Sequence, residues 1–468
     1  MSSTDARVRL ALVLMLAACG HGGGADGEHP TPPDRDRAVA RMPAAAGTAP
    51  DADAGTPAPV DAALDPTVFL DVPPGSLDAW FSALAAAERQ EPGARVLVTV
   101  FGDSHTASDL LTSPLRTAWQ ARFGDAGRGL VAAGKPPTKH YTQRDVHYGA
   151  TGAWHVAIGG PRDSEPFGIA GERIYGSKRG AQLWVETCAE CKAGTATADL
   201  EVWYQAAPGH GSIKVRVDEA PWQTLSTALP KGISPHPDRL VLTVPDGPHR
   251  LTLEHAGGGV VDLFGVVLER PRPGVIVDAL GVVGRRLGSL RSWDWHVIGA
   301  QLAMRAPRLV VLQYGTNEAD DPDLVLDDLA HYYDDVIARI RAAVPGTAIA
   351  ILGPPDLGVR AGGSRCASAE DCAWRTPTML LQIIGVEHAA AVRNRVAFFD
   401  TFAAMGGADQ MDAWATADPR IAYGDHTHFT ALGYQRWADA LSTALLAAYA
   451  TWRSAHDVPG ALPAPPAR

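Results

Sequence analysis

The stretch VTVFGDSHTASDL, residues 98–110, sets the pattern on which the fold is built. A run of apolar, largely β-branched residues ends at a glycine, and an acid, a hydroxyl and an imidazole follow at once. A continuous apolar run of this kind is typical of a strand that is buried on both faces of a parallel sheet. Ser104, which comes directly after it, is then either a helix cap or a nucleophile. Residues far along the chain decide between the two.

Strand and helix patterns alternate before and after a central region of different texture. Continuous apolar runs predict strands at residues 95–100, 273–280, 307–315, 347–355 and 396–400. Apolar residues at helical spacing predict helices at 76–90, capped by Ser76, at 110–124, 324–344 and 379–394, and at 430–453, capped by Thr430. Such alternation predicts an α/β fold with a doubly wound parallel sheet, whose site lies at the carboxyl ends of the strands.

Residues 141–272 follow another pattern. SIKVRVD (212–218) and RLTLE (250–254) alternate between apolar and polar residues, and glycine- and proline-rich turns separate runs of this kind at short intervals. This pattern predicts an inserted all-β sandwich or jelly-roll domain. Four aromatic residues of the insert either stack on sugars or belong to its core: Trp184, Trp203, Tyr204 and Trp222.

Composition and the first residues bear on location. The chain has 468 residues, of which 46% are hydrophobic, and a net charge of −11, so nucleic acid is not an expected partner. Arg7 and Arg9, an apolar run at 10–18 and then Cys19 predict a lipoprotein signal peptide over residues 1–18, or else a plain signal peptide. Lipidated Cys19 would anchor an exported protein to the bacterial envelope, and Gly20 after it favours the outer membrane.

The regions flanking the predicted domains have low complexity, and the cysteines are few. Residues 19–66 are rich in Ala, Pro, Gly and Asp and predict a disordered tether, and residues 456–468 predict a flexible tail. Beyond Cys19, the chain has four cysteines: Cys188, Cys191, Cys366 and Cys372. In an exported chain an even count of this kind favours two local disulfides, with a four-thiolate zinc site as the alternative.

Three segments carry residues suited to acyl chemistry. Ser104 follows the first strand, Asn317 lies in GTNE after the strand at 307–315, and Asp425 and His428 lie in DHTHFTALGY before the last helix. A serine nucleophile needs a base that removes its proton and an acid that orients the base, and the oxyanion needs hydrogen-bond donors. The alternative for the third segment is a metal cluster of Asp425, His426 and His428.

In this order, the segments resemble the sequence blocks of the SGNH (GDSL-type) esterase family. FGDSHTASD is similar to the first block, GTNE to the third and DHTHFTALGY to the fifth. The resemblance implies a three-layer, flavodoxin-like SGNH-hydrolase fold over residues 67–140 and 273–455, interrupted by the insert. It also implies a Ser104–His428–Asp425 triad that needs no metal or cofactor. DALGVVGRRL is similar to the second block, so the implied oxyanion donors are Ser104 N–H, Asn317 and Gly284, with Gly281 as the alternative to Gly284.

The chain is most similar to one branch of this family, the bacterial peptidoglycan O-acetylesterases, whose insert resembles a carbohydrate-binding module. Histidine after the serine, GTNE and the inserted β domain carry this likeness. It implies an acetylated polysaccharide such as peptidoglycan as the partner. The alternatives are an esterase or acetyltransferase acting on another acylated glycan, and a glycan-binding lipoprotein with a vestigial site. Substrate contacts are expected from four further residues: His105, Arg285, Arg286 and Glu318. The two arginines depart from the branch, which has a small residue after the glycine of the second block. If they face the cleft, they favour an anionic substrate; the alternative is that they are ordinary surface residues.

Overall fold

The computed structural model describes residues 64–135, 143–160, 165–360, 362, 368 and 372–456. The predicted signal peptide with Cys19, nearly all of the predicted tether, and Cys366 lie outside these residues. Among the helices in the described part of the chain, none combines the length and the apolar character needed to cross a membrane.

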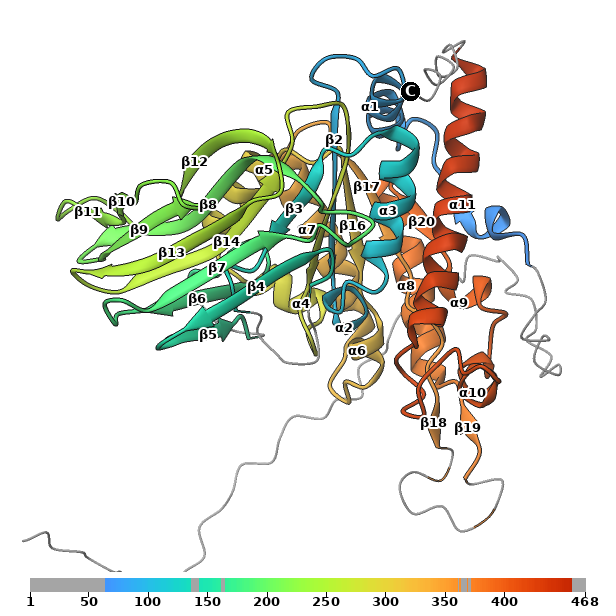
Figure 1. The fold of residues 1–468 in the computed structure, drawn as a ribbon. Helices are drawn as coiled ribbons and strands as arrows, with labels where there is room; N and C mark the ends of the chain where they lie inside the picture. Colours follow the sequence, from blue (N-terminus) through green and yellow to red (C-terminus); the bar gives the residue numbers. More distant parts are fainter. Residues whose placement is uncertain are drawn as a thin grey trace, which may run out of the picture. The chain divides into compact units, whose positions relative to one another are not determined.

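A six-stranded sheet lies at the centre of the α/β part of the molecule (Figure 1). Its order is β1-β20-β17-β16-β2-β15, and all neighbours are parallel except β1, which pairs antiparallel with β20. The strands are β1 (Leu70–Asp71), β2 (Arg95–Gly102), β15 (Gly274–Gly281), β16 (Leu309–Gln313), β17 (Ala348–Leu352) and β20 (Ala397–Phe399). The parallel strands, taken in chain order, therefore have the flavodoxin-like arrangement 2-1-3-4-5, as expected.

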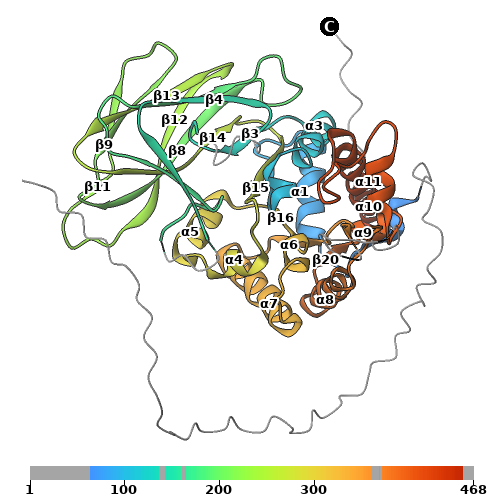
Figure 2. The same cartoon turned by 90° about the horizontal axis from the view of Figure 1, so that it is seen from below.

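Two layers of helices cover this sheet (Figure 2). One layer packs on the face that carries Val98 and Val100, and its main helices are α1 (Asp78–Glu88), α3 (Thr112–Phe123), α10 (Gln410–Thr416) and α11 (Ala431–Ala455). The other packs on the face that carries Phe101, with helices α4 (Leu287–Ser292), α5 (Trp295–Arg305), α7 (Leu326–Ala343) and α8 (Thr378–Asn394). Short helical turns complete the set: η1 (Pro66–Phe69), α2 (Ser104–Ala107), α6 (Thr316–Ala319) and α9 (Thr401–Ala404).

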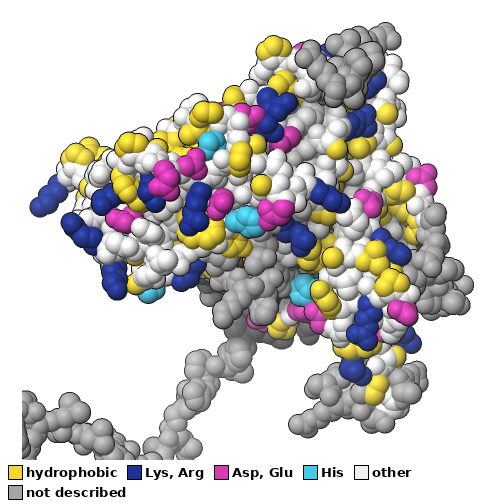
Figure 3. Space-filling view, viewed as in Figure 1, with side chains coloured by type: hydrophobic (Ala, Val, Ile, Leu, Met, Phe, Trp, Pro, Cys, Tyr) yellow, Lys and Arg dark blue, Asp and Glu magenta, His cyan; other side chains and the backbone are white. Residues whose placement is uncertain are grey.

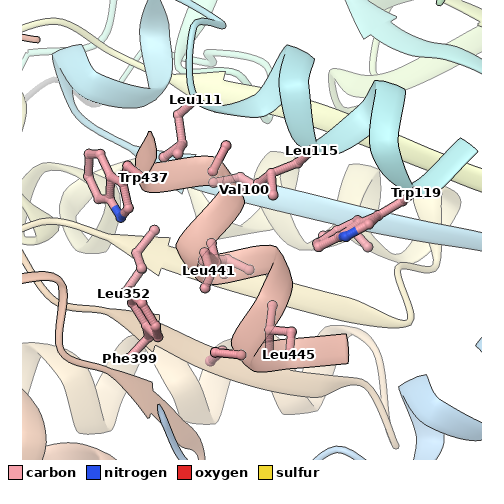
Figure 4. Packing of buried hydrophobic residues seen from close by; sticks show 14 of the residues in the cluster. Val100, Leu111, Leu115, Trp119, Leu352, Phe399, Trp437, Leu441 and Leu445 are labelled. Atoms are coloured by element: carbon pink, nitrogen blue, oxygen red, sulfur yellow. The ribbon is translucent and has the colours of Figure 1, made fainter. Parts of the chain in front are cut away.

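Burial on both faces explains why the strands lack polar alternation. Val96, Val98 and Val100 of β2 point into one helical layer, and Phe101 points into the other. Figure 4 shows the first layer from close by, where Leu441 of α11 packs toward the strands. The final helix begins where expected, because the Thr430 side chain accepts a hydrogen bond from Gly433 N. The Ser76 cap is wrong, since the cap residue of α1 is Leu77 and makes no side-chain cap bond.

The insert forms two antiparallel-rich sheets. The five-stranded sheet has the order β10-β9-β13-β7-β4. The seven-stranded sheet has the order β11-β8-β14-β6-β5, and in addition β12 pairs with β8 and β3 pairs with β14. Their bounds are β3 (Gly127–Val131), β4 (Val146–Thr151), β5 (Trp154–Ile158), β6 (Glu172–Gly176), β7 (Gln182–Thr187), β8 (Thr197–Pro208), β9 (Ser212–Val217), β10 (Gln223–Ser226), β11 (Ala228–Leu229), β12 (His236–Gly247), β13 (Arg250–Gly257) and β14 (Val261–Glu269). A separate two-stranded hairpin joins β18 (Val359–Arg360) and β19 (Trp374–Arg375).

The sandwich and the α/β part share packing. β3 precedes residue 141 yet pairs with β14, so the seven-stranded sheet takes up a segment that the sequence pattern assigns to the hydrolase part. Trp203 and Phe264 of the insert lie in the same buried cluster as the helices α4, α5, α7 and α8. Trp203 is fully buried and Tyr204 is 5% exposed, which makes both core residues and removes them from the set that could stack on sugars.

One of the two predicted cysteine pairs is seen as a disulfide in the described residues. Cys188 and Cys191 form a disulfide with a Cα–Cα distance of 5.3 Å, which leaves no free thiolates in this pair for zinc. Cys372 is also disulfide-bonded.

On the face drawn in Figure 3, basic and acidic side chains are interspersed rather than gathered into a patch of one sign.

Candidate active site

The candidate site lies where β2 and β16 end, side by side in the sheet. This is the point at which the strand order reverses, because β15 lies on one side of β2 and the later strands lie on the other. Open α/β sheets form their ligand crevices at such points, outside the carboxyl ends of the strands. Ser104 begins α2 directly after β2, and Asn317 lies in α6 shortly after β16. The topology thus brings together two segments that are more than 200 residues apart.

The turn that carries Ser104 is fixed by capping and close packing. The Asp103 side chain caps α2 by accepting a hydrogen bond from His105 N at 2.9 Å. Gly102 has no side chain to accommodate, and a Cβ at this position would overlap the Thr106 hydroxyl. Ser104 is only 5% exposed. As the first residue of a helical turn, its N–H has no acceptor within the helix and can serve another oxygen.

The Asp-x-x-His segment folds into a turn around its own carboxylate. One oxygen of Asp425 accepts hydrogen bonds from Thr427 N at 3.1 Å and His428 N at 3.0 Å. The other oxygen lies 2.8 Å from His428 Nδ1. Backbone pairing between Tyr423 N and the His428 carbonyl, at 2.8 Å, closes the loop. The spacing of three residues therefore lets a single carboxylate hold both the backbone and the imidazole of its partner.

The serine, histidine and aspartate form one chain of hydrogen-bonding groups. Ser104 Oγ lies 2.9 Å from His428 Nε2, and His428 Nδ1 lies 2.8 Å from Asp425 Oδ2. Burial works to raise the pKa of Asp425, but the hydrogen bonds from His428 and Thr427 and the charge attraction of His428 together outweigh it, so that this pKa lies below its usual value. An imidazole held by a carboxylate and in contact with a hydroxyl can remove the hydroxyl proton.

His105 lies beneath this chain rather than in the site. It is fully buried, packs against the rings of Phe429 and Trp437, and its Nδ1 lies 3.0 Å from the Tyr434 hydroxyl. Burial, and to a lesser extent the nearby His428, lowers the pKa of His105 to about 3, which keeps the imidazole neutral. The expected contact between His105 and substrate is therefore wrong, because no substrate can reach a side chain enclosed in the core.

Hydrogen-bond donors are available on the same rim. The Asn317 amide uses one N–H on the Arg285 carbonyl at 3.1 Å, and an amide of this kind has a second N–H to offer. Gly284 is exposed at a turn with φ of +68°, and a Cβ there would meet no atom within 4 Å. Gly281 is different, since a Cβ at that position would overlap the backbone of Ala107. Gly284 is thus the more open of the two second-block glycines.

The two arginines that follow Gly284 are engaged within the protein. Arg285 Nε donates to the Gly159 carbonyl at 2.6 Å. Arg286 Nε donates to the Asn317 carbonyl at 2.9 Å, and its guanidinium pairs with Asp321. Both head groups are thus held in part by protein oxygens, and substrate contact by the two arginines stays a prediction.

Glu318, also expected at the substrate, is 1% exposed. Its carboxylate accepts hydrogen bonds from Leu287 N at 2.8 Å and from Gly315 N at 2.9 Å, so it joins the loop after β15 to the loop after β16. Burial raises the pKa of Glu318 despite these bonds. It also raises the pKa of Asp103, to about 7, with a further contribution from Glu318. These acids support the loops of the site and are not exposed to a substrate.

His426, considered in the sequence only as a metal ligand, instead supports the turn. Its ring stacks on Trp374 with 3.8 Å between ring centroids. Its Nδ1 lies 3.0 Å from the Gly424 carbonyl, and its Nε2 lies 2.9 Å from an Asp412 oxygen. Both ring nitrogens are therefore occupied, which speaks against the metal cluster. The sequence holds no sign of this role, because Trp374 comes from a distant hairpin.

Comparison with known proteins shows what this chain is similar to and supports its fold. Residues 248–436 match the GDSL-like lipase/acylhydrolase family. A solved structure of a peptidoglycan O-acetylesterase is 23% identical, with a TM-score of 0.67, and the match covers 82% of this chain and 99% of that chain.

More distant solved structures also match, and no curated protein does. A lipase/acylhydrolase from Enterococcus faecalis is 14% identical, with a TM-score of 0.27 over 37% of this chain and 77% of its own. A family two carbohydrate esterase from Cellvibrio japonicus is 14% identical, with a TM-score of 0.24 over 66% of this chain and 98% of its own. The family match and the fold shared with the O-acetylesterase structure confirm the expected SGNH-type fold.

Proposed function

We propose that this SGNH-type acylhydrolase is a serine esterase that removes O-acetyl groups from peptidoglycan. The observation that carries the proposal is the continuous contact from Ser104 Oγ through His428 to Asp425, with separations of 2.9 and 2.8 Å. The similar structure, described as a peptidoglycan O-acetylesterase, supports the choice of substrate, because the match extends over 82% of this chain.

The first half of the reaction would form an acyl-enzyme. His428 takes the proton of Ser104 as the hydroxyl oxygen attacks the ester carbonyl, and Asp425 stabilises the imidazolium that results. The negative charge moves to the carbonyl oxygen of the tetrahedral intermediate. When the intermediate collapses, the bond to the sugar oxygen breaks, and His428 gives its proton to that oxygen. The sugar leaves with a free hydroxyl, and the acetyl group remains on Ser104.

Water would complete the cycle by the same steps. His428 removes a proton from water, the hydroxide attacks the acetyl carbonyl, and the intermediate releases acetate as Ser104 recovers its proton. The proposed oxyanion donors are Ser104 N–H, Gly284 N–H and the second N–H of Asn317. Each lies in a turn or short helix that follows a strand of the sheet, so the fold itself supplies the donors and the proposed mechanism requires no metal or cofactor.

The deciding experiment measures free acetate after incubation with O-acetylated peptidoglycan and with acetylated xylan. We expect release from peptidoglycan, and we expect Ser104→Ala to abolish it. Ser108→Ala is the matched control, because Ser108 lies in the same segment and its hydroxyl is 3.4 Å from the His105 carbonyl, away from His428. Release of acetate from xylan alone would show that the protein is an esterase but that peptidoglycan is not its substrate. Full activity of Ser104→Ala would overturn the proposal.

A further inference from the structure

Arg285 connects the β insert with the loop that carries Asn317. Its side chain reaches the insert, where Nε donates to the Gly159 carbonyl at 2.6 Å. Its own carbonyl oxygen accepts the hydrogen bond from Asn317 Nδ2 at 3.1 Å. One residue thus contacts the sandwich through its side chain and orients an amide of the site through its backbone.

The part of the insert that Arg285 contacts is held firmly. Gly159 follows β5, and its N–H donates to the Gly171 carbonyl at 2.8 Å. The Trp293 ring packs against both glycines: a Cβ on Gly159 would lie 2.6 Å from Trp293 Nε1, and a Cβ on Gly171 would overlap the ring. Trp293 Nε1 also donates to the Gly160 carbonyl at 3.0 Å. Close packing and a hydrogen bond thus join this part of the insert to Trp293 at the end of α4.

Asn317 is held from its backbone side as well. Arg286 Nε donates to the Asn317 carbonyl at 2.9 Å, and the same guanidinium pairs with Asp321. With the backbone fixed in this way, the direction of the Asn317 amide depends on the acceptor that it meets. That acceptor is the Arg285 carbonyl. A shift of the Arg285 backbone would therefore turn the Asn317 amide, whose second N–H is the proposed oxyanion donor.

We propose that Arg285 is a positioning residue: its contact with the β insert fixes its backbone, and its backbone carbonyl orients the amide of the oxyanion donor Asn317. This inference rests on the proposed function. It gives the insert a part in catalysis on small soluble esters, where glycan binding by the insert cannot contribute.

The test is a comparison of Arg285→Met with Arg285→Lys on an aryl acetate. We expect Arg285→Met to lower kcat by roughly 10-fold with KM unchanged, less than the 10²–10³ that removal of a whole oxyanion donor costs. Arg285→Lys should recover part of the loss, because its ammonium group can still donate to the Gly159 carbonyl. The control is Arg272→Met, because the Arg272 side chain is about half exposed and makes only a loose ion pair with Asp246, at 3.9 Å. Thermal unfolding of each variant separates a folding defect from a catalytic one.

A double-mutant cycle makes the route explicit. If Arg285 acts through Asn317, Arg285→Met should add little to the loss already caused by Asn317→Ala. An equal loss from Arg285→Met in both backgrounds would overturn the inference, and so would a change confined to KM. Failure of the proposed function has a different signature, because Ser104→Ala or Asn317→Ala would then leave the rate unchanged.

Discussion

The two halves of the candidate site are held by different forces. On the serine side, Asp103 and His105 are fully buried and Ser104 is 5% exposed. On the other side, the side chains of Asp425 and His428 are 50% and 27% exposed. Core packing and a helix cap fix the first half, whereas hydrogen bonds within one loop fix the second. Apart from the nucleophile Ser104 itself, substitutions in the buried half should therefore change mainly stability, and substitutions in the exposed half should change mainly the rate.

The strongest test of this contrast is Asp425→Asn. Loss of the carboxylate removes the partner that holds the His428 tautomer and stabilises its charged form, so kcat should fall about 10³–10⁴-fold. The free energy of unfolding should change little, because Asp425 is half exposed. Steady-state kinetics and urea unfolding check the two parts. Asp439→Asn, on the exposed face of α11, is the control. A fall in kcat of less than 10-fold would assign Asp425 no more than a local structural role.

A smaller effect on the rate is expected from His426→Ala. The substitution removes the stacking on Trp374 and the contact with Asp412 that brace the turn, while both reacting side chains remain. We expect kcat to fall roughly 10-fold, below the 10² that a 1 Å misplacement can cost. The control is His331→Ala on the exposed surface of α7. A rate equal to that of the unaltered protein would mean that Asp425 and the backbone bond from Tyr423 fix the turn without His426.

The smallest effect on the rate, and a clear one on stability, is expected from Asp103→Asn. Burial raises the pKa of Asp103 to about 7, above the value of about 3.9 in an unfolded chain. The folded protein thus holds a proton that the unfolded chain has released between these values. Its contribution to stability is full below about pH 4 and is lost as the pH rises through about 7.

Asparagine does not ionise and can still accept the bond from His105 N. The free energy of unfolding of Asp103→Asn, taken relative to that of the unaltered protein, should therefore be higher at pH 8 than at pH 5. Urea unfolding at the two pH values measures the gain, with Asp328→Asn on α7 as an exposed control. An identical difference at both pH values would show that Asp103 does not titrate in this range.

The sequence determined what depends on neighbouring residues. Continuous apolar runs predicted the strands of the central sheet, because burial on both faces excludes polar alternation. Thr430 predicted the start of the last helix. The candidate residues Ser104, Asn317, Asp425 and His428 were recognisable because their segments, in this order, resemble the sequence blocks of the SGNH family; the position or spacing of each one alone also fits a cap, turn or surface residue.

Only the tertiary structure decided which distant groups meet. The resemblance implies His428 as the partner of Ser104, and the structure gives the physical reason that the adjacent His105 is not, because the aromatic residues around α11 enclose His105. The tertiary structure also engaged Arg285 with the insert and drew β3 into the seven-stranded sheet. These contacts join segments separated by more than a hundred residues, and their formation depends on how the layers pack. A local pattern records which side chains can react or be buried, whereas packing determines which partner each of them finds.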